Sequence, residues 1–303
     1  MVAYEAKSKK IIAVGNKAKK MLGKTPEDIE VTRPIRNGVI SDYIMTERML
    51  KIYVKSAIAK RKIWGKPNIC VCVPSGVTDV QRRAACDAVY RTGAKNVYVL
   101  EEPFAAAIGA GVDIESAVGA MVVDIGAGTT DIAIVARGGV QHSSSIKIGG
   151  DDFDEAIIRY MRKRHNVLLG ESSAEQLKKD IGSVYPREQD AIGYARGKEL
   201  VRGLPTKMAV KSSEMIEACQ EETDQILDSV REMLEAAPPE LVSDISEHGI
   251  ILAGGGSKIF GMDKLIMDKI GVPVVNIKNP DQVVATGAGT AHYYIKDGRT
   301  LEE

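Results

Sequence analysis

The residues best suited to chemistry form a short acidic and glycine-rich segment, 124–131, which reads DIGAGTTD. Its glycines let backbone N–H groups approach phosphate oxygens closely, and its threonines add hydroxyl donors. The two carboxylates, Asp124 and Asp131, can hold a hydrated magnesium ion. Apolar runs on both sides predict strands over 121–124 and 130–135. The segment therefore predicts a phosphate site, with a polar-tipped hairpin turn as the alternative.

Other common phosphate and metal motifs are absent from the sequence. A dinucleotide fingerprint would run from its glycines into a helix, whereas a strand follows here, and no G-x-x-x-x-G-K-[ST] occurs. The four histidines are scattered, and no C-x-x-C or H-E-x-x-H is present. We therefore expect no zinc-type metal site.

A second glycine run, 254–256, also follows an apolar strand, predicted over 250–252. It lies about 130 residues beyond the first turn, which suggests that distant parts of the chain line one ligand. Glu175 and Lys178 are three apart on a predicted helix, 174–181, and so share one face. Their spacing alone favours a surface ion pair, and contact with a ribose and a base is the alternative.

The elements that position these residues are predicted to be strands and helices in alternation, which indicates α/β layers. The longest predicted helices cover 43–61, 77–92, 152–165, 213–235 and 283–294. A length of 303 residues suggests two domains.

Charge excludes one class of function. Lys and Arg total 41, as do Asp and Glu, so the net charge of zero argues against a nucleic-acid binder. Residues 1–66 nevertheless hold 16 basic against 6 acidic residues, which makes this part a basic surface. The sequence shows neither a signal peptide nor a run of about 18 apolar residues, so we expect a cytoplasmic protein.

Three segments carry a resemblance to the superfamily of actins, heat-shock chaperones and sugar kinases. Segment 124–131 resembles its second phosphate loop, 101–109 its first connecting helix and 252–261 its adenosine loop. Within the superfamily, the chain resembles the MreB family of bacterial cell-shape actins. The segments that carry this closer similarity are 21–26, 33–40, 73–79 and 238–245.

The resemblance implies an actin-like ATPase fold of the α/β class, with two domains of mixed sheet and flanking helices around a nucleotide cleft. The implied small subdomains are 1–45 and 152–213. The implied large subdomains are 46–116 with 286–303, and 117–151 with 214–285.

The resemblance also implies which residues bind ATP and Mg²⁺. Glu102 would position the attacking water, with Thr129 as its partner at the phosphate. Glu101 is the second choice for this role. The alternative for Glu102 is that it only supplies a favourable charge at a helix N-terminus. Asp124 and Asp131 would hold the metal. The implied nucleotide-binding residues are Gly126, Ala127, Gly128, Thr129, Thr130, Gly149, Gly150, Asp151, Glu175, Gln176, Leu177, Lys178, Gly254, Gly255, Gly256, Ser257 and Lys258.

The implied function is that of a cytoskeletal ATP-binding protein with slow hydrolysis. It would assemble into filaments at the inner face of the cell membrane, determine cell shape and guide the cell-wall synthesis machinery. Ile63 and Trp64 lie among basic residues and would touch anionic lipid, or would fold back on the core. An inactive actin-fold scaffold and a chaperone-like ATPase are the alternatives.

One part of the family pattern does not appear. Such proteins begin with two strands joined by a first phosphate loop, which would precede the segment 2–14. We therefore expect an incomplete first domain, weak ATP binding and poor hydrolysis.

Overall fold

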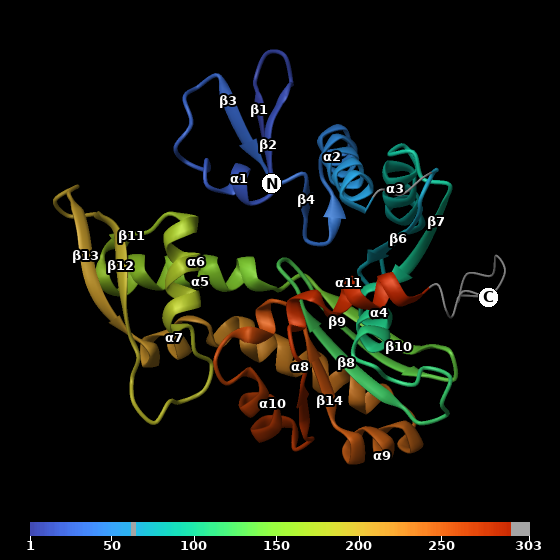
Figure 1. Ribbon diagram of the computed structural model, residues 1–303. Coiled ribbons are helices and arrows are strands. Elements are labelled where there is room, and N and C mark those ends of the chain that lie inside the picture. Colours follow the sequence, from blue (N-terminus) through green and yellow to red (C-terminus); the bar gives the residue numbers. More distant parts are fainter. Residues whose placement is uncertain (62–64, 292–303) are drawn as a thin grey trace. The chain divides into compact units, whose positions relative to one another are not determined.

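The computed structural model describes residues 1–61 and 65–291, and the chain forms two compact units, Met1–Leu100 and Glu101–Glu303. Each unit has its own helices and sheets (Figure 1). The candidate nucleotide and metal residues, which begin at Glu102, all belong to the second unit.

The first unit combines small sheets with two longer helices. Strands β1, β2 and β3 form an antiparallel sheet in the order β2-β1-β3, β4 pairs with β5, and β6 pairs with β7. A small apolar cluster of Val2, Tyr4, Met45 and Met49 joins β1 to α2. The elements are β1 (Val2–Glu5), β2 (Ile11–Val14), α1 (Asn16–Lys19), β3 (Ile29–Thr32), β4 (Ile35–Arg36), β5 (Val39–Ile40), α2 (Tyr43–Arg61), β6 (Asn68–Val73), α3 (Asp79–Tyr90) and β7 (Asn96–Glu101).

The second unit is built on a five-stranded mixed sheet with the order β10-β9-β8-β14-β15. Strands β8, β9 and β10 are antiparallel neighbours, whereas β14 runs parallel to both β8 and β15. These strands are β8 (Ala120–Ile125), β9 (Thr130–Ala136), β10 (Gly139–Ile146), β14 (Ile250–Ala253) and β15 (Val274–Asn276). The helices of this part are α4 (Glu102–Gly109), α8 (Gln220–Ala236), α9 (Pro239–His248), α10 (Met262–Ile270) and α11 (Val283–Thr290), with short turns η1 (Gly256–Lys258) and η2 (Pro280–Gln282).

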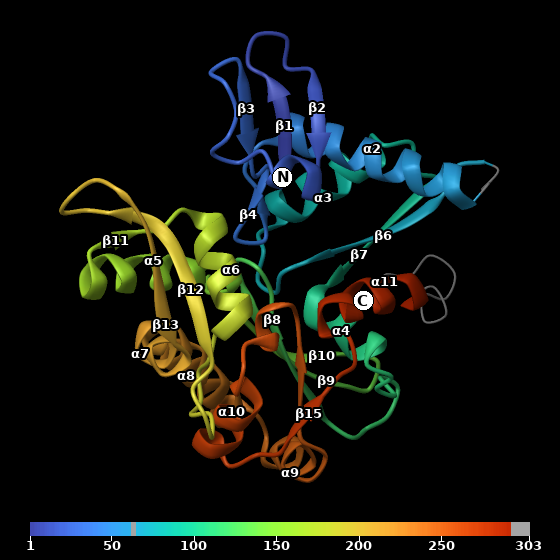
Figure 2. The same ribbon diagram turned by 60° about the vertical axis from the view of Figure 1, so that its left-hand side comes forward.

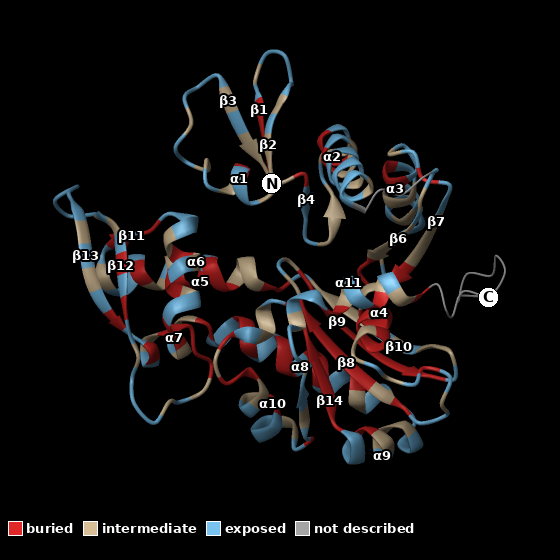
Figure 3. Ribbon diagram, in the orientation of Figure 1, coloured by how far each residue is buried: buried red, intermediate tan, exposed pale blue. Residues whose placement is uncertain are grey.

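The two faces of the β8–β9 hairpin have different neighbours. Val123 of β8 belongs to the large core cluster, together with Ile226 and Val230 of α8. Because successive side chains on a strand point to opposite faces, Asp124 lies on the other face. Helix α4 packs against β8 and β9 without contributing to that core cluster. Figure 3 shows the central strands as almost wholly buried.

A smaller lobe of the second unit holds a three-stranded antiparallel sheet, β11-β12-β13, beside two helices (Figure 2). Helix α5 packs on α6 and β11, and α6 packs on β12. The elements of this lobe are α5 (Gly150–His165), β11 (Val167–Leu168), α6 (Glu171–Ile181), β12 (Ile192–Glu199), β13 (Pro205–Lys211) and α7 (Ser212–Ala218).

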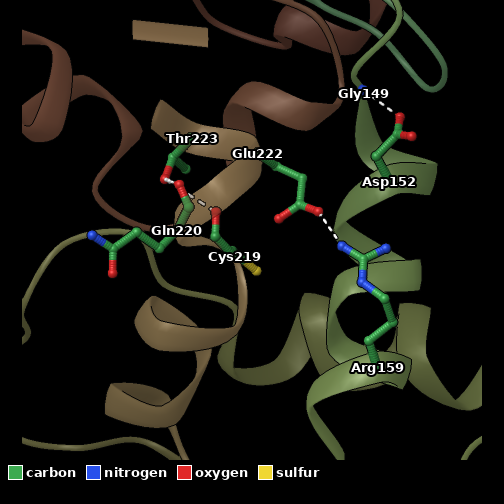
Figure 4. Close-up of polar contacts among 7 residues, drawn as sticks. All are labelled: Gly149, Asp152, Arg159, Cys219, Gln220, Glu222 and Thr223. Atoms are coloured by element: carbon green, nitrogen blue, oxygen red, sulfur yellow. Dashed lines mark hydrogen bonds and ion pairs between the residues drawn. The ribbon is translucent and has the colours of Figure 1, made fainter. Parts of the chain in front are cut away.

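The single helix predicted over 213–235 is wrong, because α7 and α8 are separate helices with a break at Cys219. The hydroxyl of Thr223 donates to the carbonyl of Cys219 at 3.1 Å and to that of Gln220 at 2.9 Å (Figure 4). Such side-chain bonds to preceding carbonyls bend helices. The apolar spacing continues across the break, so the spacing alone did not reveal it.

Candidate functional site

The predicted phosphate segment is a tight turn between two buried strands. Pairing of β8 with β9 places Asp124 directly opposite Asp131, and the N–H of Gly126 closes the turn by donating to the carbonyl of Thr129 at 2.8 Å. Asp124 is 4% exposed and Asp131 is 1% exposed. Two carboxylates therefore share one face of the hairpin in an almost water-free setting.

The second glycine turn lies at the same edge of the sheet. Ala253, the last residue of β14, pairs with Asp124, so both strands deliver their turns at one place. Gly254 has φ +84°, and a Cβ there would lie 2.4 Å from an oxygen of Asp124 and 2.1 Å from the Ile125 carbonyl. Only glycine fits this position. The parallel pairing of β8 and β14 thus unites turns that are about 130 residues apart.

The start of α5 completes the turn around 126–128. The amides of Gly150 and Asp151 donate to the carbonyls of Gly126 and Ala127 at 3.0 and 2.7 Å. A Cβ on Gly149 would lie 2.7 Å from the Ala127 carbonyl, so this close approach requires glycine. The N–H of Gly149 in turn donates to the Asp152 carboxylate at 2.7 Å (Figure 4).

Helix α4 brings Glu102 to the same face as the two aspartates. Pro103 lies in the first turn of the helix, where its missing N–H does no harm, and the helix is buried against β8 and β9. Helix α11 fixes α4 from its other side. A Cβ on Gly287 would lie 1.7 Å from the Ala105 carbonyl, so the two helices are in backbone contact.

Burial and neighbouring negative charge perturb the carboxylates of this face. Burial, followed by the charges of Asp131 and Asp124, raises the pKa of Glu102 to about 8. Burial and Asp131 raise the pKa of Asp124 to about 7. Perturbed carboxylates grouped in this way are typical of functional sites.

The same electrostatics bear on whether magnesium fits. In the described part of the chain, no three His, Cys, Asp or Glu side chains are arranged to hold a metal by themselves. Mg²⁺ is usually bound by one or two carboxylates, several waters and a nucleotide's phosphates. Asp124 and Asp131 supply the carboxylates, and a cation there would relieve their repulsion. The donor set fits a magnesium ion that arrives with a nucleotide.

The residues predicted to contact the nucleoside lie on α6, but they have different surroundings. Leu177 is 1% exposed and belongs to the core, whereas Gln176 is exposed and donates to Asp180. Glu175 is ion-paired with Lys179 at 2.7 Å, one turn further along the helix.

Lys178 reaches toward α5 instead. Its ammonium donates to the Gly150 carbonyl and lies 2.8 Å from a carboxylate oxygen of Asp154. Sequence analysis missed Asp154. Its position four residues after Gly150, hence on the same side of α5, is the only signal that could have indicated it.

The remaining predicted residues lie at the second glycine turn or outside the described chain. Ser257 donates to the Gly254 carbonyl at 2.7 Å, and Lys258 is ion-paired with Asp281. Ile63 and Trp64 fall outside the described residues. Among the helices of the described residues, none is both long and apolar enough to cross a membrane.

The fold and the site together define the class of protein, which has an actin-like ATPase fold. Both glycine turns lie at one sheet edge, where three carboxylates converge and the N-terminus of α5 meets the first turn. The model of the MreB/Mbl protein family matches residues 1–300. The chain therefore belongs to the MreB/Mbl family, as the resemblance predicts.

Curated relatives and solved structures agree with this assignment. The cell shape-determining protein MreB of Escherichia coli is 46% identical over 283 residues, which are 93% of this chain and 82% of that protein. The cell shape-determining protein Mbl of Bacillus subtilis is 41% identical over 289 residues, 95% of this chain and 86% of that one.

A crystal structure of MreB5 of Spiroplasma citri bound to ADP has a TM-score of 0.91 at 35% identity. The match covers 97% of this chain and 88% of that one. A filament structure of MamK has a TM-score of 0.77 at 24% identity and covers 93% of this chain and 85% of that one. It supports the fold. The predicted actin-like fold is thus confirmed.

Proposed function

We propose that this chain is a cell-shape cytoskeletal protein that binds ATP with Mg²⁺ and hydrolyses it slowly. The observation that carries the proposal is the convergence of Glu102, Asp124 and Asp131 beside the turn 126–129. The ADP-bound relative, with a TM-score of 0.91, supports a nucleotide as the ligand. ATP rather than another nucleoside triphosphate comes from the family resemblance.

The proposed role of each residue follows from its position in the site. The amides of Ala127 and Gly128 would donate to phosphate oxygens, and the start of α5 supports this turn through the bonds of Gly150 and Asp151. Turn 254–256 would let backbone lie against the base. Asp124 and Asp131 would hold the magnesium ion, which would neutralise phosphate charge. Glu102 orients water toward the terminal phosphate, with Thr129 beside it, because phosphoryl transfer needs positioning more than covalent chemistry.

We propose further that ATP favours assembly of the chain into filaments, and that hydrolysis loosens them. Membership of the MreB/Mbl family supports self-assembly. Electron microscopy of the purified chain with ATP, with ADP and without nucleotide tests it. Filaments that require ATP support the proposal, whereas their absence in all three conditions favours the inactive-scaffold alternative.

The proposed site of action is the inner face of the cell membrane, next to the cell-wall synthesis machinery. The basic excess within residues 1–66 supports contact with anionic lipid. Cosedimentation with anionic vesicles should weaken with salt, and replacing Ile63 with Ser and Trp64 with Ala should reduce it. Unchanged cosedimentation of that variant would contradict a role for this tip.

A further inference from the structure

The ammonium of Lys178, on helix α6, contacts the start of α5. It lies 2.8 Å from a carboxylate oxygen of Asp154 and donates to the Gly150 carbonyl. The Lys178 and Asp154 side chains are only 16% and 10% exposed. Water therefore screens this pair much less than it would screen a surface pair.

Gly150 connects the pair to the phosphate turn. Its carbonyl accepts from Lys178, and its N–H donates to the Gly126 carbonyl at 3.0 Å. A Cβ added at Gly150 would lie 3.4 Å from the Lys178 ammonium, so the ammonium lies close against the backbone of this residue. An uninterrupted series of polar contacts runs from Asp154 through Lys178 and Gly150 to Gly126.

Other carboxylates could compete for the same ammonium. Asp151 and Glu175 lie close enough to act on Asp154 electrostatically. Of these, Glu175 is ion-paired with Lys179. Asp154 is the carboxylate that the described contacts place against Lys178, so it determines where the ammonium points.

We propose that Asp154 is a positioning residue for nucleotide binding: it aims Lys178 at Gly150 and so fixes helix α6 relative to the phosphate turn. The inference rests on the proposed function, because α6 carries Glu175 and Lys178, the residues assigned to the nucleoside. Asp154 acts through Lys178 and need not touch the nucleotide.

The energetics separate positioning from a purely structural role. Burial raises the pKa of Asp154 to about 6, and the opposing effect of Lys178 is smaller. Ionised Asp154 is therefore less stable in the folded chain than in the unfolded chain. Asparagine removes this costly charge but keeps an oxygen beside the Lys178 ammonium, which also retains the Gly150 carbonyl and some exposure to water. The Tm should therefore change little, although Lys178 is held less firmly.

The experiment compares Asp154→Asn with Glu155→Gln in the full chain. Glu155 is the next residue of α5 and is exposed, so the control removes the same charge away from Lys178. Titration with a fluorescent ADP measures affinity, and thermal unfolding without nucleotide measures stability. We expect Asp154→Asn to lose about 10-fold in affinity with Tm unchanged within about 2 °C, and Glu155→Gln to match the wild type in both.

Lys178→Met supplies a second, independent readout. If Asp154 acts through Lys178, the double variant Asp154→Asn/Lys178→Met should lose no more affinity than Lys178→Met alone. Additive losses would overturn the inference, as would an affinity of Asp154→Asn equal to that of Glu155→Gln, or a loss that accompanies a large fall in Tm. A wild-type chain that fails to bind ADP would instead overturn the proposed function, and the inference with it.

Discussion

Carboxylates have opposite effects on folding in two regions of the second unit. At the sheet edge, burial and then the charge of neighbouring carboxylates raise the pKa of Glu102 to about 8 and that of Asp124 to about 7. At the junction of α5 and α8, the carboxylates have donors: Asp152 accepts from the Gly149 amide, and Glu222 accepts from the Arg159 guanidinium at 2.5 Å (Figure 4). Ionisation of the first group opposes folding. In the second group, Glu222 ties α8 to α5 and Asp152 caps α5.

The difference indicates which acidic residues bind a ligand. A buried carboxylate surrounded by other carboxylates is stabilised when a cation or a proton arrives, so the sheet edge suits Mg²⁺ and water activation. A buried carboxylate that is already paired with a guanidinium gains less from a further cation. The following variants should act on activity at the sheet edge and on stability at the junction.

The largest expected effect is on hydrolysis. Glu102→Gln keeps the shape of the side chain but replaces one carboxylate oxygen that orients the water with an NH2 group, so phosphate release should slow by about 100-fold or more. Nucleotide affinity should stay within a few fold, because the amides and magnesium ligands remain. Single-turnover phosphate release and equilibrium titration measure the two quantities. Wild-type hydrolysis in this variant would move the role to another residue, with Glu101 as the next candidate.

The junction should respond with stability instead. Arg159→Ala removes the partner of Glu222, which is 5% exposed, and should lower the free energy of unfolding by roughly 1–3 kcal/mol. The half-exposed guanidinium keeps this loss below that of a fully buried pair. Urea unfolding measures it, with Arg162→Ala on the same helix as a control. A matching fall in nucleotide affinity, measured well below the unfolding transition, would show that the junction also affects nucleotide binding and would contradict the proposed difference between the two regions.

The smallest effect is expected at the start of α5. Asp152→Ala removes the acceptor for the Gly149 amide and should cost about 1 kcal/mol of stability, a typical value for a helix cap. Because Gly149 touches the phosphate turn, a modest loss of affinity should accompany it. Urea unfolding and ADP titration of the same sample measure both. Equal stability of variant and wild type would show that the cap contributes nothing.

The sequence predicts the sheet edge better than the lobe around α6. Asp124 and Asp131 are close in the chain, and a short hairpin allows few ways to pair them. Glu102 depends on the family resemblance, since α4 reaches the hairpin only through tertiary packing. Asp154 escaped prediction because its partner Lys178 comes from a different helix, and helical spacing says nothing about contacts between helices.

The hairpin β12–β13 was also not predicted. Ile192 and Tyr194 are large apolar residues, yet they are 61% and 56% exposed and alternate with small buried residues. Hydrophobicity along this strand therefore does not tell the inner face from the outer face. Ser212 and Ser213 end the hairpin by donating to Asp190, a contact across 22 residues and more. Such contacts depend on the assembled lobe and leave no local signature.

The account's central claim is that the carboxylates of the sheet edge reduce stability until a magnesium nucleotide binds. Thermal unfolding of the wild type and of Asp124→Asn, each with and without Mg·ADP, tests it most directly. We predict that Asp124→Asn unfolds at a higher temperature than the wild type without ligand, by roughly 1–2 kcal/mol of stability. Mg·ADP should raise the Tm of the wild type and leave that of the variant nearly unchanged. A variant that is less stable than the wild type, or that gains as much from Mg·ADP, would contradict the account.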